Sequence, residues 1–153
     1  MAGPGGTAGA KERQLGFVES LITHDVRVSD STIMDAGETA TEGYEAALEL
    51  LKDPARRPSA VVCFNDMVAL GVYCAAHELS LEIPVDLSVT GFDGLDFTEL
   101  LGPPLTTVDI HAGQLGQEMA GLLLKVIRGE AGEEKITEWV EPALVVRGSV
   151  RRV

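Results

Sequence analysis

The sequence predicts an α/β fold in which a parallel β-sheet is flanked by helices. Three apolar runs, at residues 59–64, 87–92 and 105–110, are typical of strands buried on both faces. Segments with helical periodicity lie before and between these runs. Strands that alternate with helices form β-α-β units, whose strands run parallel. The length of 153 residues is that of about one domain.

Composition narrows the class of protein. Hydrophobic residues make up 45% of the chain, enough for a packed core, so a disordered chain is excluded. The formal net charge of −12 makes binding of nucleic acid by these residues alone unfavourable. We find no apolar run long enough for a membrane span and no secretory signal at the start. We therefore expect a cytoplasmic protein without a membrane partner, in which Cys63 and Cys74 are buried, reduced thiols.

The first half of the chain contains two predicted helices. Residues 1–9 are rich in glycine, and we expect no regular structure there. Apolar spacing predicts a helix at about residues 10–24, and residues 31–36 are expected to form a short strand. Thr39 and Glu42 form a capping box. The helix that it begins ends at Asp53, because Pro54 follows.

The second half alternates strands with helices and ends in an extended tail. Asn65 and Asp66 are expected to cap a helix that ends at about Leu79. A long helix is predicted over residues 111–128, with Gly129 closing it. One face of that helix carries Leu115, Met119, Leu122 and Val126. Residues 139–150 are expected to be extended around Pro142.

Two polar side chains follow predicted strands and form the first candidate site. Asn65 comes directly after residues 59–64, and Asp93 directly after residues 87–92. Ligands of open parallel sheets bind beyond the carboxyl ends of the strands, so an amide and a carboxylate there suit a polar ligand with hydroxyl groups. Helix capping alone is an equally good explanation of Asn65 and Asp66.

Other chemical sites find less support. Residues 3–8 fit the G-x-G-x-x-A pattern of dinucleotide-binding loops, with Asp25 at the distance of a ribose-binding acid. That mechanism needs a strand before the first glycine, and the given sequence has only two residues there. The three histidines lack partners at metal spacing, and no G-x-S-x-G elbow is present. We expect no catalytic residues, no metal and no cofactor.

Five blocks, in order, resemble those of one family. Residues 63–71 read CFNDMVALG, residues 87–94 read LSVTGFDG, and residues 103–108 read PPLTTV. Residues 13–17 (RQLGF) and 145–149 (VVRGS) add supporting matches. Together they resemble the effector-binding region of transcriptional regulators of the lactose- and galactose-repressor (LacI/GalR) type, over essentially the whole chain.

The resemblance implies a non-enzymatic regulator whose fold is the C-terminal lobe of a periplasmic-binding-protein-like type I fold, truncated. Family members bind operator DNA through an N-terminal headpiece, and the given residues contain nothing similar to it. By this resemblance residues 1–110 are the C-terminal effector-binding lobe. Residues 111–140 are the crossover helix and strand that normally pack on an N-terminal lobe. Residues 141–153 are the C-terminal strand and tail. The apolar face of residues 111–128 then lacks its usual partner, so another chain or a rearranged docking is expected to cover it.

The resemblance also assigns ligand-binding residues. Arg13 matches a helix arginine that meets hydroxyls or a carboxylate of the effector, although a surface ion pair with a glutamate of its own helix is the alternative. Asn65 and Asp93 match the amide and the carboxylate of the cleft. Glu38 stands where an aromatic residue often stacks on the ligand. Ile110 stands where sugar-binding members often have glutamine, so a simple sugar is a weaker expectation than a small, sugar-like polar effector.

The same family forms homodimers through the helix that begins at Asp66 and the loop over residues 97–104. That helix is apolar nearly all round, so a second packing layer is needed, either from the same chain or from a partner. We expect it to be a partner chain. The predicted contact residues are Met67, Leu70, Cys74, Phe97 and Leu101.

Two functions, each in a different cellular compartment, fit this resemblance. The first is the effector-binding and dimerisation part of a LacI-type regulator, in which the effector shifts the population of conformations that bind DNA. The alternative is a periplasmic-type sugar-binding protein of the same fold. The PPLTT block and the VRGS ending favour the regulator.

Overall fold

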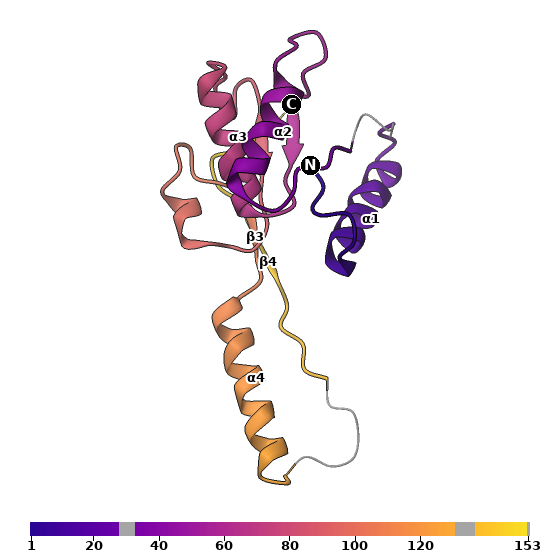
Figure 1. Ribbon diagram of the computed structural model, residues 1–153, viewed down its shortest axis with the longest axis vertical. Helices are drawn as coiled ribbons and strands as arrows, with labels where there is room; N and C mark the ends of the chain where they lie inside the picture. The colour runs from indigo at the N-terminus through magenta and orange to yellow at the C-terminus, as the bar shows by residue number, and fades with distance from the viewer. Residues whose placement is uncertain (28–32, 131–136, 153) are drawn as a thin grey trace.

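The computed structural model describes residues 1–27, 33–130 and 137–152, and one helix projects from the body that the other elements form (Figure 1). The order of elements agrees with the alternation predicted from the sequence. The helices are α1 Ala8–Thr23, α2 Ala40–Leu51, α3 Asp66–Glu78 and α4 Ala112–Ile127. The strands are β1 Ala60–Val62, β2 Ser88–Thr90, β3 Thr107–Asp109 and β4 Ala143–Val145.

The three apolar runs form adjacent parallel strands, as predicted. β1 pairs with β2 in parallel, with Val61 opposite Val89. Single parallel bridges, Thr90 to Thr106 and Asp93 to Asp109, join β2 to the β3 segment. β4, from the extended tail, pairs antiparallel with β3. The carboxyl ends of β1, β2 and β3 therefore lie at one edge of the sheet.

Helices α2 and α3 pack closely on each other and supply most of the core. The capping box predicted at Thr39 is present, and it begins α2. Gly43 of α2 and Gly71 of α3 let the two backbones approach, because a Cβ at either position would overlap backbone atoms of the other helix. The fully buried core residues include Ala47, Leu51, Val68, Val72, Ala75, Leu87, Val89 and Leu105.

The other face of the sheet is only partly covered, which contradicts the prediction that residues 59–64 are buried on both faces. Val61 and Cys63 are buried, whereas Ala60 is exposed and Val62 is 46% exposed. The reason is the placement of α1, which leaves a hollow of about 380 Å³ between itself and the strands.

The glycine-rich start is more ordered than expected. Ala2 forms a parallel bridge with Asp35, and the amino group of Met1 donates to the carbonyl oxygen of Val62 over 2.8 Å. Thr7 then caps α1, its Oγ1 accepting from the N–H of Ala10. The strand predicted over 31–36 is only partly testable, because residues 28–32 lie outside the described residues. Residues 33–36 contribute only the single bridge at Asp35.

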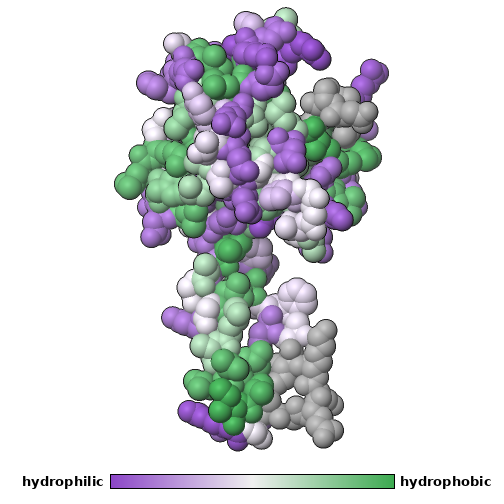
Figure 2. Space-filling model, viewed as in Figure 1, coloured by the Kyte–Doolittle hydropathy of each residue, from purple (hydrophilic) through white to green (hydrophobic). Residues whose placement is uncertain are grey.

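Helix α4 projects as an arm, the name used below for residues 112–127. It begins after His111, and Gly129, with φ of +69°, closes it as predicted. None of its residues is buried, and Met119 is 64% exposed. Figure 2 shows hydrophobic residues gathered on the visible face of the arm. Among the described residues, no helix combines the length and the hydropathy that crossing a membrane requires.

Candidate ligand-binding site

The candidate site lies where the three parallel strands end. The N–H of Asp66, after β1, donates to the carbonyl oxygen of Phe92 over 2.8 Å. The N–H of Asp93, after β2, donates to the carbonyl oxygen of Val108 in β3 over 2.9 Å. These bonds hold the ends of neighbouring strands together, so the side chains that follow them share one edge, as the sequence predicted.

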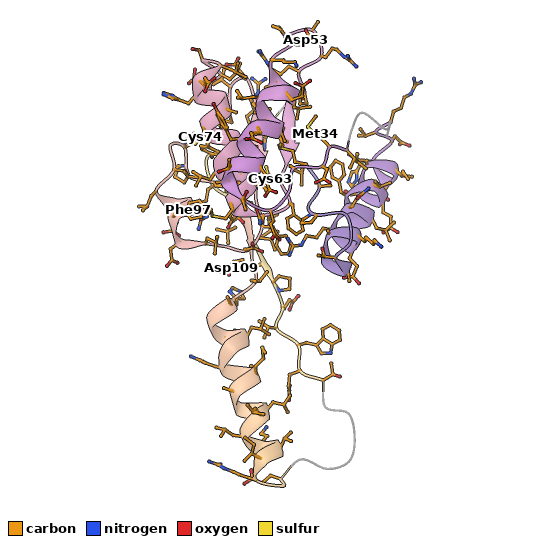
Figure 3. All side chains as sticks on the ribbon, viewed as in Figure 1. Met34, Asp53, Cys63, Cys74, Phe97 and Asp109 are labelled. Carbon is orange, nitrogen blue, oxygen red and sulfur yellow. The ribbon has the colours of Figure 1, made fainter. Side chains whose placement is uncertain are left out.

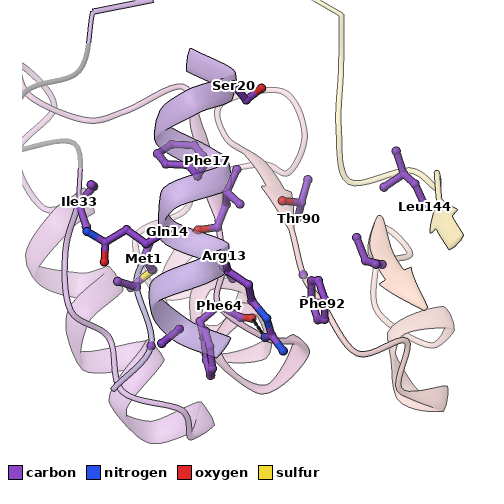
Figure 4. Close-up of a pocket in the computed structure, with 17 residues that line it drawn as sticks. Met1, Arg13, Gln14, Phe17, Ser20, Ile33, Phe64, Thr90, Phe92 and Leu144 are labelled. Carbon is purple, nitrogen blue, oxygen red and sulfur yellow. Dashed lines mark hydrogen bonds between the residues drawn. The ribbon is translucent and has the colours of Figure 1, made fainter. Parts of the chain in front are cut away.

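Arg13 and Asp93, which are far apart in the sequence, form an ion pair at this edge. Arg13 Nη2 lies 3.8 Å from Asp93 Oδ1, and Arg13 Nη1 donates to the carbonyl oxygen of Phe64 over 2.6 Å. The guanidinium also lies over the Phe64 and Phe92 rings, 4.6 and 3.7 Å from their centroids (Figure 4). Such cation–π contacts fix the head of a long side chain. Arg13 therefore pairs with Asp93 and not with a glutamate of its own helix.

Partial burial shifts the pKa values of both side chains of this pair. Burial lowers the pKa of Arg13, and the charge of Asp93 opposes that shift. Burial likewise raises the pKa of Asp93, with Arg13 acting against the shift and Asp66 adding to it. The side chains of Arg13 and Asp93 remain 34% and 29% exposed. A ligand can therefore reach both partners of a pair that is already partly desolvated.

The backbone at Asp93 adopts an uncommon conformation. Asp93 has φ of +108° and Gly94 has φ of +75°. A positive φ is costly for a residue with a side chain, and such strain persists only where the surroundings hold it. The turn directs the Asp93 side chain toward Arg13 instead of continuing the strand.

Asn65 is placed at the same edge, but its side chain is occupied. Oδ1 accepts from the N–H of Val68 over 2.8 Å, which is the predicted helix cap. Nδ2 donates to the carbonyl oxygen of Glu38 over 3.0 Å. Asn65 is only 9% exposed. The predicted helix cap is therefore present, and Asn65 also ties the segment before α2 to the site.

Two hollows adjoin the ion pair. The first, of about 380 Å³, lies between α1 and the strands and is largely apolar; Arg13 lines it together with Phe17, Phe64 and Phe92 (Figure 4). The second, of about 470 Å³, is polar and lies around the start of α4. The residues that line the second hollow include Asp93, Gly94, Asp96, Asp109, His111 and Gln114.

Sequence reasoning missed Asp109 and His111. His111 Nδ1 lies 3.1 Å from Asp109 Oδ2, and the N–H of His111 donates to Asp109 Oδ1 over 2.7 Å. Asp109 is the last residue of β3, so the rule that pointed to Asn65 and Asp93 also applies to it. Ile110, which follows it, is half-buried. Glu38 is exposed and is connected to the site through its backbone.

In the described part of the chain, no cluster of three or more His, Cys, Asp or Glu side chains is arranged to hold a metal ion.

The glycine-rich start of the chain has a packing role. A Cβ at Gly3 would overlap the ring of Phe64. Close packing accounts for Gly3, and helix capping accounts for Thr7, without a nucleotide.

The predicted dimer contacts lie on the outer face of α3 and on the loop beside it. We call Met67, Leu70, Cys74, Phe97 and Leu101 the α3 surface. Cys74 is exposed, so the prediction that both cysteines are buried is wrong for Cys74 and confirmed for Cys63. In Figure 3, Cys74 and Phe97 lie on the side of the body away from α1. Tyr73 Oη donates to the carbonyl oxygen of Pro103 over 2.8 Å, which connects α3 to the loop.

Comparison with known proteins identifies the family. The family model described as periplasmic binding protein-like domain matches residues 1–150. The HTH-type transcriptional repressor PurR of Pectobacterium carotovorum subsp. carotovorum (strain PC1) is 35% identical over 138 residues, which are 90% of this chain and 40% of that repressor. The chain thus belongs to the periplasmic binding protein-like domain family and corresponds to the effector-binding region of its LacI-type transcriptional regulators.

Solved structures agree with this assignment. The transcriptional regulator CelR in complex with cellobiose superposes with a TM-score of 0.87 at 29% identity, over 97% of this chain and 45% of that one. The lac repressor dimer bound to operator and the anti-inducer ONPF gives 0.81 at 28% identity, over 97% and 50%. The chain spans about 40% of the length of the curated relatives and about half of these structures. These relatives are regulators, which favours the regulator over the periplasmic-type binding protein.

Proposed function

We propose that this chain binds a small polar effector and forms a homodimer as part of a LacI-type transcriptional regulator, and that it is not an enzyme. The observation that carries the proposal is the Arg13–Asp93 pair at the carboxyl edge of the parallel strands. A carboxylate accepts hydrogen bonds from hydroxyl groups, and a guanidinium donates them. The effector class is therefore a sugar-like molecule with several hydroxyl groups.

Roles for the individual residues follow from their exposure and their bonds. Arg13 and Asp93 contact the effector directly, because both are partly exposed. Asn65 contributes mainly by holding the backbone of Glu38. Glu38 places a charge at the rim of the site, where other members of the family often have an aromatic side chain that stacks on the effector. Ile110 supplies an apolar contact to the effector. The chain itself supplies one wall of the site.

The proposed division of the chain follows the projecting arm. Residues 1–110 form the effector-binding lobe, residues 111–140 the crossover segment, and residues 141–153 the strand and tail. Operator DNA is contacted only through a headpiece outside the given residues, since the charge of −12 opposes phosphate binding here. Action on DNA places the protein in the cytoplasm. The effector acts by shifting populations between conformations that differ in DNA affinity.

The test is a titration of the isotopically labelled chain with cellobiose, sucrose and glucose, followed by NMR. A site that encloses a ligand covers roughly 70–90% of its surface, and here only one wall is present. We therefore expect saturable shifts at Arg13 and Asp93 with dissociation constants in the millimolar range, and no micromolar affinity. The shifts should vanish in Asp93→Ala and persist in Glu45→Ala, which removes an exposed carboxylate of α2.

Two results would contradict the proposal. One is that none of the three sugars perturbs Arg13 or Asp93. The other is that Asp93→Ala binds a sugar as tightly as the original chain. Micromolar binding that Asp93→Ala abolishes would keep the site and show that this lobe is a complete binding site by itself.

A further inference from the structure

Asp66 is a buried acidic residue to which the proposed function assigns no task. It is the first residue of α3 and is 0% exposed. We propose that Asp66 is the positioning residue that holds Asp93 in its binding conformation, by anchoring the loop after β2 to α3 and β3. This inference rests on the proposed function, because it concerns the geometry of that same site.

Each carboxylate oxygen of Asp66 has its own partner on a different element. Oδ2 accepts from the N–H of Leu95 over 2.8 Å, in the loop after β2. Oδ1 accepts from the hydroxyl of Thr107 over 2.6 Å, in β3. A single side chain therefore connects α3, the loop that carries Asp93, and the strand that leads to the arm.

The space around this carboxylate depends on Gly91. A Cβ at position 91 would overlap Asp66 Oδ1 and would lie 2.9 Å from Leu105 Cδ2. Glycine at position 91 thus leaves room for the carboxylate beneath the end of β2. Burying an acid is costly unless it is hydrogen-bonded, and both partners of Asp66 meet that need.

The loop needs such anchors because its backbone is strained. Asp93 and Gly94 have φ of +108° and +75°. On one side of this turn the N–H of Asp93 bonds to Val108. On the other side the N–H of Leu95 bonds to Asp66. Asp93 is held between the two anchors, which sets the direction of its side chain toward Arg13.

Measurements without any ligand test this inference on the full chain. We compare Asp66→Ala and Asp66→Asn with Ser149→Ala, a control that removes a side chain equally buried and equally hydrogen-bonded, in contact with Val89 and Thr106. The first measurement is hydrogen exchange of the Leu95 amide relative to core amides of α3. The second is the titration of the Asp93 carboxyl group, followed by carbon-13 NMR.

Asp66→Ala should speed Leu95 exchange by at least about tenfold, since the loss of a hydrogen bond to a charged acceptor costs that much or more. Asp66→Asn keeps an acceptor for Leu95, so its exchange should stay within about threefold of the original. Asp66→Asn should also lower the pKa of Asp93, because the neighbouring negative charge that raises it is removed. Ser149→Ala should change neither quantity at these positions.

Binding of cellobiose connects these results to the site. We expect Asp66→Asn to change the dissociation constant by less than about threefold and Asp66→Ala to weaken binding by at least about tenfold. The inference is overturned if Leu95 exchange responds no more to Asp66→Ala than to Ser149→Ala. It is equally overturned if the Asp93 titration is unchanged in Asp66→Asn.

The test still decides the inference if Asp66→Ala does not fold or if the original chain binds no sugar. If Asp66→Ala does not fold, Thr107→Val, which removes one partner of the carboxylate, takes its place and should speed Leu95 exchange less than Asp66→Ala would but more than Ser149→Ala does. If the original chain binds no sugar, the proposed function fails. The Leu95 and Asp93 measurements still decide whether Asp66 anchors the loop, because they need no ligand.

Discussion

The packing of α2 on α3 makes a sharp prediction about a single methyl group. In Gly43→Ala the added Cβ would lie 2.7 Å from the carbonyl oxygen and 2.8 Å from the Cα of Val68. Ordinary contacts begin at 3.4 Å, so the overlap is about 0.7 Å. The atoms met are backbone atoms of α3, which no side-chain rotation can move away. The helices must therefore separate.

The size of the effect follows from two opposing contributions. Alanine in place of glycine within a helix stabilises by about 0.5–1 kcal/mol. Overpacking against a rigid neighbour costs about 1–3 kcal/mol, and a gap of 0.5–1 Å forfeits roughly a quarter to a half of the dispersion energy across the interface. We expect Gly43→Ala to lower the free energy of unfolding by about 1–2 kcal/mol.

Gly16→Ala in α1 is the matched control. Nothing lies within 4 Å of a Cβ at position 16, so only the helical gain remains. We expect the free energy of unfolding to rise by about 0.5–1 kcal/mol. Urea unfolding followed by circular dichroism measures both variants, with unchanged slopes as the check that the denatured state is the same. If Gly43→Ala is as stable as Gly16→Ala, the close approach of α2 and α3 described above is wrong.

Three further predictions concern association and charge. Leu70→Asp should convert a dimer to a monomer, because it places a carboxylate in the contact; an unchanged dimer mass by light scattering for a folded variant would move the contact elsewhere. The pKa of Asp93 is raised in the folded state, so protonated Asp93 contributes to the free energy of unfolding fully at pH values below the pKa of an unfolded aspartate. That contribution is lost as the pH rises through the raised pKa. Asp93→Asn should therefore gain stability relative to the original chain as the pH rises from below the ordinary range of an aspartate pKa, and a constant difference in urea unfolding would contradict this. An isolated helix of this length is only marginally stable, so the amides of residues 115–126 would exchange fast if nothing covered the arm. Because another chain is expected to cover the arm, these amides should exchange slowly, and fast exchange in a monomer would refute that cover.

The order of elements and the edge that carries the site were predictable because local patterns encode them. Apolar runs mark β1, β2 and β3, and the Thr39–Glu42 capping box marks the start of α2. Once the strands are known to be parallel, topology places Asn65 and Asp93 at the same edge. The resemblance added Arg13, which no periodicity would have singled out.

The tertiary structure decided how these side chains are used. The guanidinium of Arg13 lies over the rings of Phe64 and Phe92 and pairs with Asp93, while the amide of Asn65 is consumed by a helix cap and by Glu38. These contacts depend on distances between elements remote in the sequence. No local pattern contains those distances.

Exposure was the property that the sequence conveyed least. Val62 and Cys74 both sit in apolar stretches, yet Val62 borders the hollow beneath α1 and Cys74 faces outward from α3. A hydrophobic side chain lowers its free energy when it is buried, but its hydrophobicity does not indicate which element buries it. That depends on which element lies opposite, so the sequence determined the strands, the helices and their order, and the packing of α1 and α3 determined which of their apolar faces are covered.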